Sequence, residues 1–357
     1  MKFYDILQLD TQINKNLQKT CTSKNEKRKL VAGMFLRSAL IVLFAIVFIS
    51  ALSHAFGTEN MPMAVSIFCI LLGIRFVDFG YCIKDSLATL SLSFLILLLA
   101  PVLASSVAPF LSFLIHLVAF FAIMFITCDK PEMGNGGLFS FAYIYLSGNP
   151  VFGDALIQRF YLTLTGLLIC GLIFYRKHKD KNKGIRFMDK VGQFDFSELK
   201  YQWMVRMSLG VSAILALGMA FDIERFMWAG FACGSLLSEY SPNPKINERS
   251  IQRFIGVIAG SLLYYGFYSL LPSSLHTIIG PLGGFFLGFC VDYKYKTAMN
   301  CLGALMIASS IYGLEISILL RISDTVMGII FAFAFFYIYD RYVFMRFCGA
   351  KQTSVNH

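Results

Sequence analysis

Two arginines and two glycines share one predicted helical face near residue 250. Arg249, Arg253, Gly256 and Gly260 follow one another at steps of four, three and four residues, which places them on one side of an α-helix. Guanidinium groups bind carboxylates through paired hydrogen bonds, and glycines four residues apart let two membrane helices approach closely. The pattern predicts an anion-attracting helix end beside a helix contact. The alternative, arginines that extend to lipid headgroups, stays open for residues at a helix end.

A second arginine pattern occurs twice in the chain. RFYLTLTG from Arg159 and RISDTVMG from Arg321 both contain Arg, three residues, Thr, two residues and Gly, and both lead into a long apolar run. Gly166 and Gly328 end the two patterns and are candidates for close helix packing. Asp324 follows Arg321 at the spacing of a helical ion pair, so a structural clamp is the alternative to an anion-binding role.

The remainder of the chain is strongly apolar. Of the 357 residues, 57% are hydrophobic and 15% are charged, whereas a soluble domain carries about a quarter charged residues. Runs such as 87–104 and 109–128 have almost no charge and are long enough to cross the hydrocarbon core of a bilayer as helices. We therefore predict an all-α integral membrane protein of about 12 transmembrane helices.

The sequence gives no sign of a catalytic site, a metal site or a cofactor. Its nine cysteines are scattered singly, without a C-x-x-C pair, and are interpreted as small apolar residues. The sequence has no P-loop motif, so transport would have to run on an ion gradient or downhill. His116 lies in an apolar run with no carboxylate three or four residues away. Such a lone histidine is more often a packed residue than a proton carrier.

Twelve apolar segments are predicted to form helices. The fifth is interrupted early by YLSGNP at Tyr145–Pro150, and interrupted spans are tolerated where other helices or a water-filled cavity satisfy the backbone. The predicted ranges are 33–56, 61–79, 86–107, 109–128, 137–151, 156–175, 204–221, 226–239, 251–271, 275–291, 297–313 and 323–345.

The charge distribution predicts that both termini are cytoplasmic. The N-terminal tail and the segment 176–200 are both rich in Lys and Arg, and an even number of predicted spans separates them. Basic residues are retained on the cytoplasmic face during membrane insertion. We therefore expect a multi-pass protein of the cell membrane with cytoplasmic termini. Its formal net charge of +10 then follows from topology, and no nucleic-acid partner is needed.

Four arginines recur in step along the two halves of the chain. Arg37 and Arg206 are predicted to begin the first and seventh helices, and Arg159 and Arg321 the sixth and twelfth. We interpret this recurrence as two parallel six-helix repeats with a transport pathway at their interface. The predicted parts are a cytoplasmic tail at 1–32, a first repeat at 33–175, a basic cytoplasmic linker at 176–203, a second repeat at 204–345 and a cytoplasmic tail at 346–357.

The second half of the chain resembles a known transporter family. Trp228-Ala229, the prolines Pro242 and Pro244 that are predicted to end the eighth helix, and the arginine-glycine face are similar to elements of the fusaric-acid-resistance-like (FUSC) family, which includes aromatic acid exporters. The element from Arg321 to Gly328 is also similar to that family. A more distant resemblance connects the chain to the aluminium-activated malate transporters. The resemblance implies a transporter of organic anions and leaves the substrate open.

The leading hypothesis is a secondary exporter of small organic anions, with aromatic carboxylates as candidate substrates. The predicted pathway residues are Arg249 and Arg253 at the cytoplasmic end, Arg321 and Arg159 at the outer end, and Arg37 and Arg206. The expected partners are a small organic anion and the lipid bilayer, and the sequence is compatible with an oligomer. Two alternatives stay open: an anion channel of the same fold, and a membrane-embedded enzyme or envelope-assembly factor that uses His116.

Overall fold

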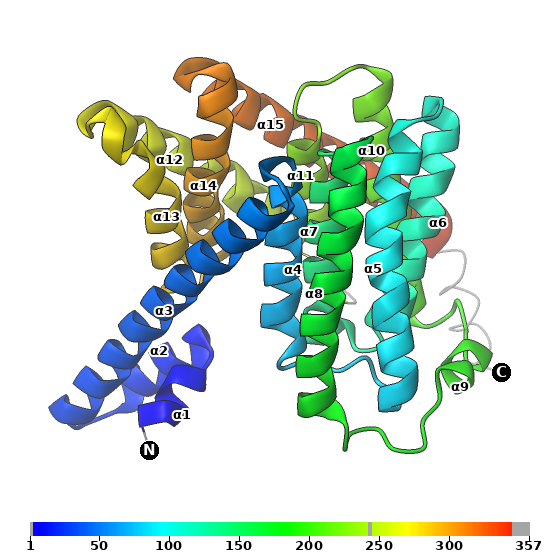
Figure 1. The fold of residues 1–357 in the computed structure, drawn as a ribbon, viewed down its shortest axis with the longest axis horizontal. Coiled ribbons are helices and arrows are strands. Elements are labelled where there is room, and N and C mark those ends of the chain that lie inside the picture. Colours follow the sequence, from blue (N-terminus) through cyan, green and yellow to red (C-terminus); the bar gives the residue numbers. More distant parts are fainter. Residues whose placement is uncertain (1–2, 242–244, 345–357) are drawn as a thin grey trace. The chain divides into compact units, whose positions relative to one another are not determined.

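The computed structural model describes residues 3–241 and 245–344, and every regular element within these ranges is a helix. Figure 1 shows the helices coloured along the chain. The predicted all-helical class is confirmed. Pro242, Pro244 and the predicted tail at 346–357 lie outside the described residues.

Six of the described helices are long and apolar enough to cross a membrane. Each has at least the length that an apolar helix needs to span bilayer hydrocarbon. They are α3 (Lys24–Phe56), α5 (Ile83–Ser105), α6 (Pro109–Thr127), α8 (Asp154–His178), α10 (Leu199–Ala220) and α15 (Leu314–Tyr339). The chain is therefore a multi-pass membrane protein, and the arrangement of twelve spans in two repeats stays a prediction.

The other six predicted spans are also helical but are shorter or more polar. They are α4 (Met61–Ile74), α7 (Asn135–Ser147), α11 (Met227–Leu237), α12 (Ile246–Leu270), α13 (Ile279–Leu287) and α14 (Tyr293–Tyr312). Most side chains of α4 and α11 are buried, so protein rather than lipid surrounds these two short helices. Short helices at membrane depth are tolerated in such a protein environment.

Four arginines that were predicted to begin helices lie inside them instead. Arg37 and Arg206 lie well within α3 and α10. Arg159 and Arg321 likewise lie in the interior of α8 and α15. Hydropathy marks the point where a segment becomes apolar, but good helix formers such as Lys, Glu and Leu extend a helix beyond that point.

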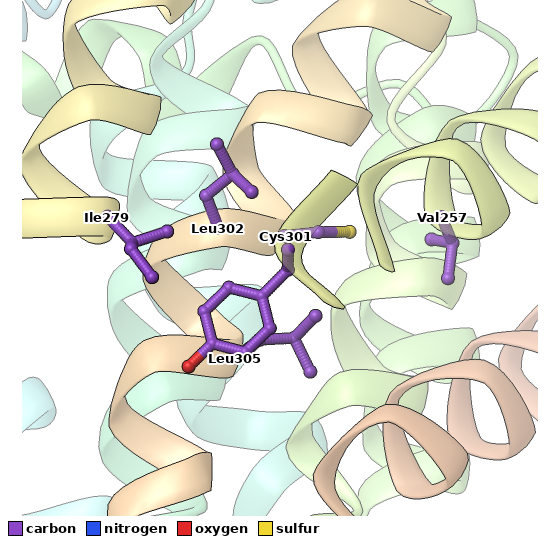
Figure 2. Close-up of a cluster of buried hydrophobic side chains, with 6 residues drawn as sticks. Val257, Ile279, Cys301, Leu302 and Leu305 are labelled. Carbon is purple, nitrogen blue, oxygen red and sulfur yellow. The ribbon is translucent and has the colours of Figure 1, made fainter. Parts of the chain in front are cut away.

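One compact unit, called unit 1 here, combines residues up to Phe48 with Glu248–Thr325. In Figure 2, the labelled side chain of α13 lies on one side of α14 and that of α12 lies on the other side. The apolar cluster between these helices consists of Val257, Tyr264, Ile279, Cys301, Leu302 and Leu305. Close van der Waals packing of this kind is the main attraction between helices in a membrane, and it holds α12 against α14.

The N-terminal segment of unit 1 forms two short helices, α1 (Phe3–Gln8) and α2 (Thr11–Thr20). Ile6 is buried, and its side chain lies directly over Gly33 of α3. The side-chain amide of Asn14 donates a hydrogen bond to the carbonyl oxygen of Leu30 at 3.3 Å. These contacts attach the segment to α3.

The second compact unit, unit 2, combines Ile49–Asn247 with the chain from Val326 onward. Within it α10 packs along α6, and α5 packs against both α6 and α8. In Figure 1 the short helix α9 (Phe187–Gly192) lies on the α5 and α6 side of this group of helices. The largest fully buried aromatic side chains of the unit are Phe79, Phe94, Phe120, Phe139, Tyr143, Phe174 and Trp203.

Candidate functional site

The two glycines of the arginine-glycine face bring α12 into backbone contact with α14. A Cβ atom on Gly256 would lie 2.5 Å from the carbonyl oxygen of Lys294, and one on Gly260 would lie 2.5 Å from that of Ala298. No side chain fits between the two backbones at these positions, which is the use that membrane helices make of closely spaced small residues. This face of α12 is therefore covered by protein.

The two arginines of the same face lie one and two turns before Gly256 and meet Tyr293 at the start of α14. Arg253 Nη1 donates a hydrogen bond to Tyr293 Oη at 2.7 Å. The guanidinium carbon of Arg249 lies 4.8 Å from the centre of the Tyr293 ring, within the range of a cation–π interaction. The site therefore joins two cationic groups, one aromatic face and one hydroxyl, the combination that suits an aromatic carboxylate.

Tyr293 is the member of this site that the sequence pattern did not reveal. It comes from a different helix, about forty residues further along the chain than the two arginines. The periodicity that groups Arg249 with Arg253 acts only within one helix. The glycine spacing at Gly256 and Gly260 predicts that another helix packs closely against this face. It does not indicate which helix, so Tyr293 could not be found from it.

Arg159 in unit 2 is enclosed by neutral hydrogen-bond acceptors. Its Nε donates to Asn60 Oδ1 at 2.9 Å, its Nη1 to the Asn149 carbonyl at 2.9 Å, and its Nη2 to the Glu59 carbonyl at 3.3 Å. The side chain is only 1% exposed. Within the described residues no carboxylate lies at salt-bridge distance from it. Arg159 thus ties α8 to the chain before α4 and the chain after α7, and its positive charge is not neutralised by an ion pair.

The side chain of Arg206, a residue of α10, reaches the C-terminal end of α11. Its Nη2 donates to the carbonyl oxygens of Leu237 at 3.2 Å and Glu239 at 2.8 Å, and its guanidinium carbon lies 5.4 Å from the centre of the Phe336 ring. The last carbonyls of a helix lack partners within it, and a cation there also interacts favourably with the helix dipole. Arg206 therefore caps α11 and connects it to α10 and α15.

The remaining two arginines belong to unit 1. Arg37 Nη1 donates to the carbonyl oxygen of Leu9, between α1 and α2. Arg321 is buried on α15, as are Asp324 and Thr325, with exposures of 4%, 3% and 0%. The predicted pairing of Arg321 with Asp324 stays a prediction. The structure thus groups Arg249 and Arg253 at Tyr293.

Gly166 and Gly328, which end the repeated arginine pattern, both pack closely against another helix. A Cβ on Gly166 would collide with Ile67 of α4, and one on Gly328 would collide with the carbonyl oxygen of Ala229 in α11. In the predicted repeats, α4 and α11 are the second helices of the two halves. The two glycines therefore meet corresponding helices.

His116 is part of a buried polar pair. Its Nδ1 lies 2.9 Å from Tyr143 Oη, and its side chain is buried. Among the described residues no group of three or more His, Cys, Asp or Glu is placed to hold a metal ion. The ring of Tyr143 also packs edge-on against the imidazole, so the two side chains form one packed unit between α6 and α7.

The helical, multi-span architecture defines the class of a polytopic membrane protein. Within that class, residues 212–335 match the family model described as fusaric acid resistance protein-like. The match confirms the predicted resemblance and includes Arg249, Arg253 and Arg321. The matched segment lies in the second half of the chain, and the similarity is to proteins described by their resemblance to fusaric acid resistance proteins. No curated protein and no solved structure shows significant similarity to the chain.

Proposed function

We propose that the protein is a secondary exporter of small organic anions, with aromatic carboxylates as candidate substrates. The single observation that carries this proposal is the meeting of Arg249 and Arg253 around Tyr293, inside the segment that matches the family model. Two guanidinium groups raise the local concentration of anions through their field. An aromatic ring beside them favours anions that carry a ring of their own.

The exchange of hydrogen bonds at Tyr293 supplies a mechanism for anion capture. In the structure Arg253 donates to a neutral hydroxyl. A carboxylate carries a full negative charge and can accept two parallel hydrogen bonds from one guanidinium, whereas the tyrosine hydroxyl is uncharged and accepts one. An incoming carboxylate therefore displaces the tyrosine hydroxyl from Arg253. The hydroxyl returns to Arg253 when the anion leaves, so the site holds its anion reversibly.

The proposed route follows the interface of the two predicted six-helix repeats. Parallel repeats with a binding site at their interface are common in secondary transporters. The matching contacts of Gly166 with α4 and of Gly328 with α11 support the repeat. Arg321 and Arg159 are proposed to guide release at the outer end, and Arg37 and Arg206 to add to the positive potential. In this proposal both termini are cytoplasmic and the protein resides in the cell membrane.

Substrate counterflow tests the proposal directly. Purified protein in proteoliposomes loaded with unlabelled 4-hydroxybenzoate should take up the labelled compound. Arg253→Gln should lower the initial rate by about tenfold or more, because the paired, charge-assisted contact is lost. Lys296→Gln is the matched control, since it removes an exposed positive charge from the same helix as Tyr293. Equal rates for Arg253→Gln and the wild type would exclude the arginine site.

Electrical recording separates the proposal from the channel alternative. A secondary exporter gives flux that saturates with substrate and depends on a coupling ion or on exchange. Ohmic single-channel currents carried by the anion, without coupling to protons, would identify an anion channel of the same fold. If Arg253→Gln lowers both the counterflow rate and the anion current, the arginine site takes part in anion passage whichever mechanism operates.

A further inference from the structure

The linker between α8 and α10 is folded onto the ends of other helices in unit 2. Asp129, just after α6, forms ion pairs with Lys190 in the linker at 3.2 Å and with Lys200 at the start of α10 at 3.1 Å. Asp85, in the first turn of α5, accepts a hydrogen bond from the backbone N–H of Phe187 at 2.8 Å. These three contacts connect α9 to the ends of α5 and α6 and, through Asp129, to the start of α10.

The chain between α4 and α5 adds further contacts to the linker. Asp78 accepts a hydrogen bond from the Asn182 side chain at 2.8 Å. Burial raises the pKa of Asp78, but the hydrogen bonds from Asn182 and the Gly80 backbone, together with two nearby lysines, outweigh burial and leave the pKa below its usual value. The backbone N–H of Cys82 donates to the Ile185 carbonyl at 2.8 Å. The inner side of the linker is thus held by backbone and side-chain bonds.

The opposite side of the linker exposes apolar residues at regular spacing. Ile185, Met188 and Val191 follow at steps of three residues and are 39%, 69% and 37% exposed. Phe194 continues the spacing, but its ring packs against Tyr201 at 4.5 Å between ring centres. The ring of Phe187, by contrast, turns inward and lies 5.4 Å from that of Tyr81. A row of exposed apolar side chains on a segment that is otherwise fixed marks an interaction surface.

Basic residues surround this apolar row. Residues 176–194, which we call the linker surface, contain seven Lys or Arg and two Asp. Four of the basic residues, Lys181, Lys183, Arg186 and Lys190, form ion pairs with Asp carboxylates, and the other three are Arg176, Lys177 and Lys179 at the end of α8. The surface also begins at the end of α8 and leads toward α10, and both helices are long and apolar enough to cross the membrane. Clusters of four to eight basic residues directly beside a transmembrane helix attract anionic lipid headgroups.

We propose that the linker surface binds the anionic lipid surface on its own side of the membrane. Ile185, Met188 and Val191 enter the interfacial region, and the basic residues at the end of α8, Arg176, Lys177 and Lys179, contact lipid phosphates. Apolar side chains bordered by basic ones are the composition of segments that lie in this region. A second copy of the chain fits this surface less well, because two surfaces with the same excess of positive charge repel each other. This inference does not depend on the proposed transport function.

Hydrogen exchange of the full-length protein in nanodiscs tests the inference. Amide exchange of peptides within 183–194 is compared between discs of phosphatidylcholine alone and discs that also contain phosphatidylglycerol. Anionic lipid should slow exchange by about fivefold or more, an effect that raised salt removes because it screens the attraction. Exchange that is equal in the two lipid compositions would overturn the proposal.

A pair of methionine variants and a lipid cross-link make the test specific. Met188→Glu should abolish the slowing by anionic lipid, whereas Met133→Glu should retain it, because Met133 is also exposed but lies outside the linker surface. A photoactivatable phosphatidylglycerol should label the peptide that contains Met188 in the wild type. Labelling that is absent there, or exchange that is unaffected by Met188→Glu, would contradict membrane contact by the apolar row.

Discussion

Arg159 in unit 2 and Arg253 in unit 1 are both buried in helices, yet their surroundings differ in kind. Arg159 directs three nitrogens to an amide oxygen and two backbone carbonyls that belong to the chain before α4 and the chain after α7. Arg253 donates to a side-chain hydroxyl, which can rotate away from it. Backbone carbonyls are fixed by the fold, whereas a tyrosine hydroxyl can be replaced by a ligand. The kind of hydrogen-bond acceptor therefore indicates the role of each arginine: fixed backbone carbonyls favour a structural role, and a movable hydroxyl favours a binding role.

The burial of Arg159 has an energetic consequence. Loss of the Arg159 guanidinium leaves three acceptors that were satisfied in the folded protein. Each buried polar group that loses its partner costs about 1–3 kcal/mol. We therefore expect Arg159 to matter chiefly for stability and Arg253 chiefly for transport, and this separation can be tested.

The largest effect is expected for Arg159→Ala. It should lower the free energy of unfolding by about 3 kcal/mol, because the hydrogen bonds from α8 to the chain before α4 and the chain after α7 are lost. Thermal unfolding of the purified protein in detergent would show this as a clear fall in Tm. Arg176→Ala is the matched control, since Arg176 is an exposed arginine of the same helix. Equal Tm values for the two variants would remove the structural role of Arg159.

The next effect concerns the helix contact that supports the arginine site. Gly260→Ala should cost about 2 kcal/mol, because the added methyl group forces α12 and α14 apart. Gly266→Ala, in the same helix, should leave stability unchanged or raise it slightly, since nothing lies within 4 Å of its added methyl group and Ala has the higher helix propensity. A similar Tm for both variants would show that the backbone contact at Gly260 does not contribute to the stability of the folded protein.

Much of the fold could be predicted from the sequence, because apolar runs of membrane length have few alternatives to a helix. The helix ends could not: α3 and α15 extend through polar residues that hydropathy ignores but helix propensity favours. The grouping of residues into unit 1, which joins the N-terminal segment to residues after Glu248, depends on contacts between distant segments. No local pattern in the sequence carries that information.

The candidate site could be predicted only where its residues belong to one helix. Arg249 and Arg253 share a helical face, which spacing reveals. Tyr293 comes from another helix, and the acceptors of Arg159 come from segments about 100 residues and 10 residues away. The folded linker was likewise hidden, because its charge composition is typical of a free cytoplasmic segment while its partners Asp85 and Asp129 are acidic residues distant in the chain.

A smaller effect, confined to transport, is expected for Arg253→Lys. Lysine keeps the positive charge but lacks the planar fork that pairs with a carboxylate. The counterflow rate should fall by about threefold to tenfold, less than for Arg253→Gln, with little change in Tm. Rates of the two variants in the same proteoliposome preparation decide the matter. A rate for Arg253→Lys as low as that of Arg253→Gln would assign the role of Arg253 to geometry alone.

The smallest effect is expected for Tyr293→Phe, and this variant gives the sharpest test of the difference between Arg253 and Arg159. This change keeps the ring beneath Arg249 but removes the hydroxyl that accepts from Arg253. If the hydroxyl competes with the substrate carboxylate, its loss should preserve transport and lower the half-saturating concentration by about twofold to threefold, which corresponds to a net hydrogen-bond contribution of about 0.5 kcal/mol. Concentration dependence of counterflow measures this shift. A rate as low as that of Arg253→Gln would instead show that the hydroxyl holds Arg253 in place, and Arg253 would then resemble Arg159.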